Sequence, residues 1–260
     1  LTWSELDNAV DDFEVGLISM GLRSGDRVGL WAVNSAEWVI VQLATARAGM
    51  ILVTINPAYR AEEFRFAMTA AGCAALIVGP AYKNSNFTKL ALEAEPNLGN
   101  PDQQKILPTI RVAIQFGAMP MHGFVHWDDV SVAGLTYGGK AIDDIFSDFT
   151  ERAPVNIQFT SGTTGLPKGV TLSHQNILQN GWFTGGALGL TERDRLCIPV
   201  PLYHCFGMVT AVLACLARGT TMVLPAPVFD AVRTLDTLER EACTAIYGVP
   251  TMYAAMLRSP

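Results

Sequence analysis

Residues 26–57 read DRVGLWAVNSAEWVIVQLATARAGMILVTINP, and this stretch decides the fold class. A β-branched, apolar run at 26–33 predicts a strand that ends at Asn34, and a similar run at 50–57 predicts a second strand. Between them, residues 36–48 have the apolar spacing of a helix. A strand, a helix and a strand within about thirty residues predict a βαβ unit with parallel strands.

The same alternation continues on both sides of this unit. Residues 5–20 and 61–72 have helical spacing and end at glycines, and AALIVG at 74–79 predicts a third strand. A second alternating stretch begins near residue 155. Its expected strands are 155–160, 169–172, 195–200, 220–225 and 243–247, and its expected helices begin at Ser173 or span 206–217, 229–241 and 250–258. The pattern predicts an α/β protein with doubly wound parallel sheets.

Residues 95–150 interrupt this alternation. Pro, Gly, Asn and Asp are dense in EPNLGNPDQ, and beyond a short predicted strand at 109–116 no sustained period appears. We therefore expect a first α/β lobe at 1–116, an irregular connection at 117–150, and a second α/β lobe at 151–260.

Composition restricts the classes of function. The chain has 260 residues, half of them apolar, and a net charge of −6, which argues against nucleic acid as the main partner. No apolar run reaches the ~18 residues of a membrane span, so no transmembrane segment is expected. Five cysteines without a CxxC pair favour a reducing, intracellular compartment. The chain begins at Leu1 and stops at Pro260 just after a helical pattern, which favours a fragment or a processed product.

The segment FTSGTTGLPKGV, at 159–170, has the composition of a ligand-binding loop. Its glycines allow close approach of the backbone to a ligand, and its hydroxyls and single lysine add donors. Backbone amides, hydroxyls and a lysine together suit a polyphosphate. The loop is no Walker A motif, because Pro167 occupies the position of the second glycine and Gly169 follows Lys168. A surface hairpin that is merely rich in Gly and Thr is the plain alternative.

The complete string resembles the signature loop of the adenylate-forming enzymes, which include acyl-CoA synthetases, luciferases and peptide-synthetase adenylation domains. Further segments resemble this family in the same order along nearly the whole chain. These segments are LTWSEL (1–6), AGMILVTINPAYR (48–60), PLYHCFG (201–207) and YGVPTM (247–252). Within the family, the motifs look most like those of medium-chain fatty acyl-CoA synthetases, including the mitochondrial-type branch.

The resemblance implies the fold, the reaction and the site. The fold would be the large N-terminal domain of the family, truncated before the small C-terminal domain. The reaction would join a fatty acid, medium-chain favoured, to ATP with release of pyrophosphate, and CoA would then displace AMP. The residues implied to hold the β- and γ-phosphates are Thr160, Ser161, Gly162, Thr163, Thr164, Gly165 and Lys168. Thr164 would also help to hold Mg²⁺, and His204 would be the catalytic residue beside the α-phosphate and the carboxylate.

Several alternatives stay open. The family's adenine-binding segment, ribose-binding aspartate and second, catalytic lysine find no match here, so the chain alone is expected to be inactive. The runner-up functions are an aryl- or amino-acid-activating enzyme of the same family and an inactive nucleotide-binding module. A homodimer is left open, and the compartment would be the cytoplasm in a bacterium or the mitochondrial matrix in a eukaryote. We interpret Cys205 as a packing residue and His174 as part of a helix cap.

Overall fold

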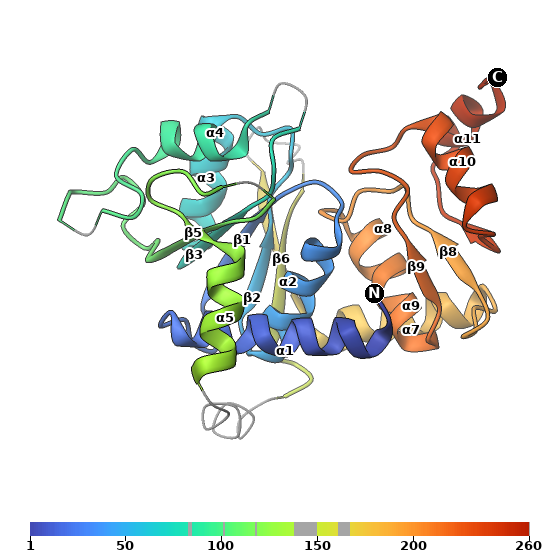
Figure 1. Ribbon diagram of the computed structural model, residues 1–260, viewed down its shortest axis with the longest axis horizontal. Coiled ribbons are helices and arrows are strands. Elements are labelled where there is room, and N and C mark those ends of the chain that lie inside the picture. The colour runs from blue at the N-terminus through green and yellow to red at the C-terminus, as the bar shows by residue number, and fades with distance from the viewer. Residues whose placement is uncertain (83–84, 101, 118, 138–149, 161–166, 260) are drawn as a thin grey trace. The chain divides into compact units, whose positions relative to one another are not determined.

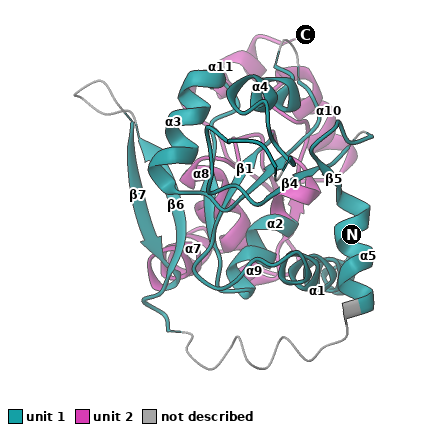
Figure 2. Cartoon of the chain, turned by 90° about the vertical axis from the view of Figure 1, so that its left-hand side faces the viewer, with its two compact units in different colours: residues 1–32, 40–174 teal, residues 33–39, 175–260 magenta. Residues whose placement is uncertain are grey.

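The computed structural model describes residues 1–82, 85–100, 102–117, 119–137, 150–160 and 167–259. The chain forms two compact units, which Figure 2 colours separately. Unit 1 contains residues 1–32 and 40–174, and unit 2 contains residues 33–39 and 175–260. Within the described ranges, no helix has both the length and the apolar character that a membrane crossing requires.

Unit 1 is built on a seven-stranded sheet (Figure 1). The strands are β1 (Arg27–Trp31), β2 (Ile51–Thr54), β3 (Ala75–Val78), β4 (Val112–Gln115), β5 (Val125–His126), β6 (Pro154–Thr160) and β7 (Lys168–Ser173). Their order is β5-β4-β3-β1-β2-β6-β7. All neighbours are parallel except β6 and β7, which are antiparallel. The predicted βαβ unit is confirmed, because β1 pairs in parallel with β2.

Helices cover both faces of this sheet. They are α1 (Trp3–Ser19), α2 (Ala36–Arg47), α3 (Ala61–Ala71), α4 (Phe87–Ala94) and α5 (Trp127–Tyr137). The chain moves in one direction from β1 to β2 and in the opposite direction from β2 to β3 and β4. Because such crossovers are right-handed, α2 must lie on one face, and α3 and α4 on the other. Figure 1 shows α3 and α4 together, with α1 and α5 on the opposite side of the sheet.

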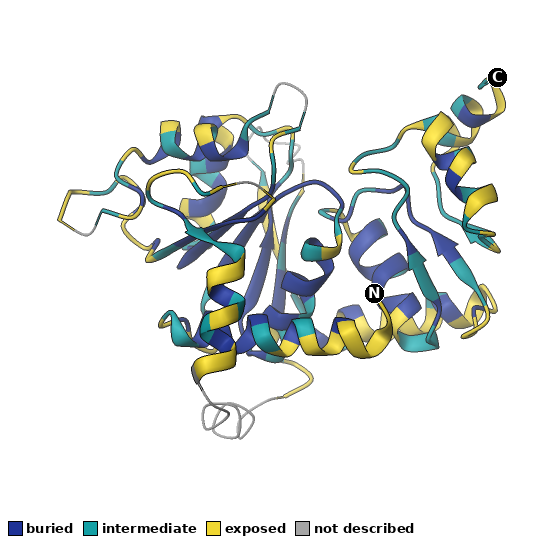
Figure 3. Cartoon of the chain, viewed as in Figure 1, coloured by how far each residue is buried: buried dark blue, intermediate teal, exposed yellow. Residues whose placement is uncertain are grey.

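The centre of unit 1 is buried and largely apolar. The strands β2 and β3 are buried along their whole length, as Figure 3 shows, which explains their continuous apolar sequences. Trp31 at the end of β1 stacks on Phe64 of α3 with ring centroids 4.4 Å apart, and Phe87 of α4 lies 5.3 Å from it. These aromatic contacts fix α3 and α4 against the sheet.

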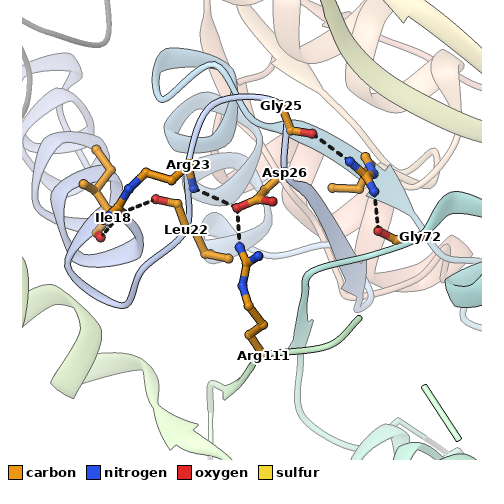
Figure 4. A network of polar contacts seen from close by, with 8 residues as sticks. Ile18, Leu22, Arg23, Gly25, Asp26, Gly72 and Arg111 are labelled. Atoms are coloured by element: carbon orange, nitrogen blue, oxygen red, sulfur yellow. Dashed lines mark hydrogen bonds and ion pairs between the residues drawn. The ribbon is translucent and has the colours of Figure 1, made fainter. Parts of the chain in front are cut away.

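A network of arginines surrounds the start of β1 (Figure 4). Asp26 accepts hydrogen bonds from the amide of Arg23 and the guanidinium of Arg111, which precedes β4. Arg27 donates to the carbonyls of Gly25 and Gly72, the latter being the left-handed residue that ends α3. The network therefore joins the ends of α1 and α3 to the beginnings of β1 and β4.

The region 117–150 differs from the irregular connection that the sequence predicts. Its described part contains β5 and α5, and α5 packs along α1. Phe13 of α1 stacks on Trp127 of α5 with ring centroids 3.9 Å apart. The helices approach closely because each presents a glycine: a Cβ on Gly16 would overlap Val130, and one on Gly134 would overlap the Asp12 carbonyl. Packing against α1 thus compensates for the weak helical propensity of WDDVSVAGLTY.

Unit 2 has a smaller parallel sheet in the order β10-β8-β9. Its strands are β8 (Arg195–Cys197), β9 (Thr221–Val223) and β10 (Ala245–Ile246). Its helical segments are α7 (His174–Ala187), α8 (Cys205–Gly207), the π-helix η3 (Met208–Leu213), α9 (Ala214–Arg218), α10 (Ala231–Arg240) and α11 (Pro250–Leu257). The divisions between the units differ from the expected lobes of 1–116 and 151–260. The reason is that β6 pairs with β2, so the hairpin of β6 and β7 belongs to the first sheet.

Candidate functional site

The hairpin of β6 and β7 presents the glycine-rich loop at one end. The two strands pair from Pro154↔Ser173 to Thr160↔Lys168, so the last pair lies where the loop begins and ends. The Thr160 hydroxyl lies 3.5 Å from the Lys168 carbonyl oxygen, and both residues are exposed. The structure thus brings these two predicted phosphate ligands together, as the first and last residues around the loop.

The other predicted loop residues are Ser161, Gly162, Thr163, Thr164 and Gly165, and they lie outside the described residues. The expected role of Thr164 in holding Mg²⁺ therefore also concerns a residue outside the described ranges. Elsewhere in the described ranges, no group of three or more His, Cys, Asp or Glu side chains could hold a metal ion.

The base of the hairpin is held firmly. The Asn156 amide on β6 is fully buried and donates to the Leu52 carbonyl of β2 at 2.9 Å. Phe159 meets Phe66 of α3 edge to face, with ring centroids 6.4 Å apart. These contacts fix the position of Thr160 relative to the sheet.

His204 lies in unit 2, as the residue that caps the N-terminus of α8. Its Nδ1 accepts a hydrogen bond from the backbone amide of Phe206 at 3.2 Å, and the Cys205 Sγ is 3.5 Å from the same atom. An accepting Nδ1 leaves the proton of a neutral imidazole on Nε2. The exposed His204 ring can therefore donate a hydrogen bond through Nε2 to a ligand.

The PLYHCFG segment bends too tightly for a side chain at its last residue. A Cβ on Gly207 would overlap the carbonyl of Pro201, and the His204 amide donates to that same carbonyl at 3.3 Å. The glycine of this motif is therefore required by close approach of the backbone.

Asn34 supports the same segment, and sequence reasoning missed this role. Its buried side-chain amide donates to the Val200 carbonyl at 2.9 Å, and its Oδ1 accepts from the Leu202 amide at 2.8 Å. Its own backbone amide donates to the Pro227 carbonyl at 2.9 Å. The sequence shows Asn34 only as the end of a strand, and a partner 166 residues away leaves no local signal.

Burial affects the protonation of His174 and of the three buried cysteines. Burial lowers the pKa of His174, which favours its neutral form. All five cysteines are free, and burial raises the pKa of the Cys73, Cys197 and Cys215 thiols to about 12. Those three thiols are therefore protonated and unreactive at neutral pH. Cys205 is exposed rather than packed, in contrast to the expected packing role.

Comparison with known proteins gives a consistent match over the chain. The family model for the AMP-binding enzyme matches residues 1–260. The mitochondrial medium-chain acyl-CoA ligase ACSF2 of Homo sapiens is 39% identical over 271 residues, covering 100% of this chain and 44% of ACSF2. YngI of Bacillus subtilis is 38% identical over 263 residues, covering 100% of this chain and 48% of YngI. The chain therefore spans less than half the length of these relatives.

Solved structures share the fold. The anthranilate CoA ligase AuaEII in complex with anthranoyl-AMP superposes with a TM-score of 0.80 at 26% identity, over 96% of this chain and 45% of AuaEII. Apo MatB from Rhodopseudomonas palustris superposes with a TM-score of 0.76 at 26% identity, over 100% of this chain and 46% of MatB. With a family model that matches the entire sequence, these findings show that the chain belongs to the AMP-binding enzyme family, the adenylate-forming enzymes that its loop sequence resembles.

Proposed function

We propose that this chain is the N-terminal part of an AMP-forming fatty acyl-CoA synthetase and contains its phosphate-binding loop. In the first step a carboxylate oxygen attacks the α-phosphorus of ATP, and pyrophosphate leaves. In the second step the sulfur of CoA attacks the acyl carbonyl, and AMP leaves. The observation that carries the proposal is the hairpin of β6 and β7, which presents FTSGTTGLPKGV between the paired residues Thr160 and Lys168.

The loop would bind the phosphates of ATP. The Lys168 ammonium supplies a point charge for the β- and γ-phosphates, and the Thr160 hydroxyl supplies a donor beside it. Ser161, Gly162, Thr163, Thr164 and Gly165 complete this proposed set through hydroxyls and backbone amides. We propose that Mg²⁺ enters with ATP, with Thr164 assisting; when bound, it neutralises part of the phosphate charge.

His204 would act at the reacting atoms. With Nδ1 occupied by the Phe206 amide, the Nε2–H group can donate to an oxygen of the α-phosphate or of the carboxylate. A donor that is already oriented stabilises charge as it develops in the transition state. We propose this role for His204 as the catalytic residue of the adenylation step.

The acid would be a medium-chain fatty acid. Support comes from the name of ACSF2, a medium-chain acyl-CoA ligase in several mammals and in Danio rerio, at 37–39% identity. An aromatic acid is the alternative, which the superposition on an anthranilate CoA ligase keeps open. The free cysteines support a reducing compartment, the cytoplasm of a bacterium or the mitochondrial matrix of a eukaryote.

The first experiment tests the phosphate role of Lys168. The protein expressed from the complete reading frame is assayed for carboxylate-dependent ATP–pyrophosphate exchange, with Lys168→Ala against the exposed control Lys89→Ala. We expect Lys168→Ala to raise the KM for ATP far more than the KM for the carboxylate. Equal changes in both constants would contradict the role.

The second experiment tests His204 in the same assay, with medium-chain, long-chain and aromatic acids. We expect His204→Ala to lower the exchange rate on the order of 10²-fold, the scale for losing one transition-state donor, while His122→Ala leaves it unchanged. A loss within twofold would remove His204 from the site. If no acid supports exchange in the wild type, the inactive nucleotide-binding module is the correct reading.

A further inference from the structure

The helix that follows His204 contains a turn of unusual geometry. Between α8 and α9, residues Met208–Leu213 form the π-helix η3. Single π turns are rare in proteins. Those that occur are often found at functional sites, where they displace the residues on either side. Here the π turn begins four residues after His204, and the amide of its first residue, Met208, donates to the His204 carbonyl at 3.1 Å.

Tyr247 holds this π turn from a distant part of the sequence. Its hydroxyl donates to the backbone carbonyl of Thr210, inside η3, at 2.6 Å. Tyr247 follows β10 directly, so a strand end fixes its backbone. Burial raises the pKa of Tyr247 to about 12, so the hydroxyl keeps the proton that this hydrogen bond requires. A side-chain donor at a carbonyl within the turn stabilises the π-helical geometry relative to that of a regular α-helix.

The same tyrosine also contacts the residue that orients His204. The Tyr247 ring lies 5.4 Å from the Phe206 ring, and the Thr210 hydroxyl donates to the Phe206 carbonyl at 2.7 Å. Phe206 is thus held through its ring and through its carbonyl. Its amide in turn donates to Nδ1 of His204. The contacts run without interruption from Tyr247 through Thr210 and Phe206 to the imidazole.

We infer that Tyr247 is a positioning residue for His204. By holding the π turn and the Phe206 ring, it keeps the Phe206 amide aimed at Nδ1 and so fixes the tautomer with the proton on Nε2. The catalytic consequence of this inference rests on the proposed function, because it requires Nε2–H to donate to a reacting oxygen. The geometric part concerns the tautomer alone and can be measured without activity.

The test uses this chain and one subtle substitution. Tyr247→Phe keeps the ring and removes only the hydroxyl. The matched control is Tyr253→Phe, because the Tyr253 hydroxyl also donates to a backbone carbonyl, that of Ile246 at 3.2 Å, which is outside η3. Long-range ¹H–¹⁵N correlation spectra in mildly alkaline buffer report the tautomer, and His204→Asn assigns the signals. Amide spectra show whether each variant is folded.

We expect Nε2–H in the wild type and in Tyr253→Phe, and a mixture of both tautomers in Tyr247→Phe. An unchanged His204 tautomer in folded Tyr247→Phe overturns the inference. If Tyr247→Phe fails to fold, Thr210→Val tests the same contacts, because it removes the hydroxyl that donates to Phe206. A mixed tautomer there supports the inference, and an unchanged tautomer overturns it.

Exchange kinetics on the protein from the complete reading frame separate this inference from the proposed function. We expect Tyr247→Phe to lower the exchange rate about tenfold, the scale of one net hydrogen bond, with the KM for ATP within twofold. In the His204→Ala background the same substitution should have no further effect, because Tyr247 acts through His204. If Tyr247→Phe changes the tautomer but His204→Ala keeps the wild-type exchange rate, only the catalytic role of His204 is contradicted. If His204→Ala lowers the exchange rate but Tyr247→Phe leaves the tautomer unchanged, only the positioning role of Tyr247 is contradicted.

Discussion

Glu14 makes the stability of unit 1 depend on pH in an unusual direction. The side chain lies on α1 and is 1% exposed, and in the described part of the chain its Oε1 accepts no hydrogen bond. Burial raises the pKa of Glu14 from 4.5 to about 7, with the Arg47 guanidinium opposing the rise and Asp11 adding to it. The carboxyl is therefore protonated in the folded state at mildly acidic pH.

The sign and size of the effect follow from linkage. Below pH 4.5 both the folded and the unfolded state hold the proton, and the contribution of Glu14 to stability is complete. Between 4.5 and about 7 only the unfolded state releases the proton, so stability falls as pH rises, and above about 7 the loss is complete. A shift of this size corresponds to about 3 kcal/mol, at 1.36 kcal/mol per pKa unit.

The substitution Glu14→Gln removes the titration and keeps the shape. Urea denaturation, followed by far-UV circular dichroism and tryptophan fluorescence, is measured from pH 4.5 to pH 8 for the wild type and the variant. We expect the stability of Glu14→Gln relative to wild type to rise by about 3 kcal/mol over this range. Glu93→Gln, at an exposed glutamate of α4, is the matched control and should show no such rise. A difference that stays flat with pH, or falls, would refute the reasoning.

Two further predictions concern packing and hydrogen bonds. Asn34→Ala leaves two buried backbone groups in segment 200–202 without partners. We expect the free energy of unfolding of unit 2, measured by hydrogen exchange of its amides, to fall by about 2–4 kcal/mol. A loss well under 1 kcal/mol would contradict the anchoring role of Asn34. Gly134→Ala forces a Cβ into the Asp12 carbonyl, and we expect a loss of about 2 kcal/mol or more by thermal denaturation, against little change for the exposed control Val132→Ala. An equal effect of both substitutions would show that α1 and α5 can separate at low cost.

The alternation of strands and helices could be predicted because each signal is local. The stretch 26–57 contains a complete βαβ unit, and β1, α2 and β2 form within it as expected. The helix α5 could not be predicted, because its valines, threonine and glycine favour other conformations and only contact with α1 compensates. The boundary between the two units could not be predicted either, because it depends on contacts between distant segments. The sequence predicts β6 as a strand, but its pairing with β2 is a long-range property.

The candidate site also has features that the sequence predicts and features that only the folded chain shows. The motifs predict binding and catalytic roles for Lys168 and His204, because a loop composition and a short string are visible in the sequence alone. The motifs do not predict the tautomer of His204, because the hydrogen bond from the Phe206 amide to Nδ1 is visible only in the folded chain. We infer that the π turn positions this amide. A π turn has no sequence signature comparable to a cap or a turn, and the Tyr247 hydroxyl that holds it lies 37 residues from Thr210. A family motif can thus propose a catalytic side chain, whereas we infer that the tautomer of that side chain also depends on Tyr247, which lies outside the PLYHCFG segment.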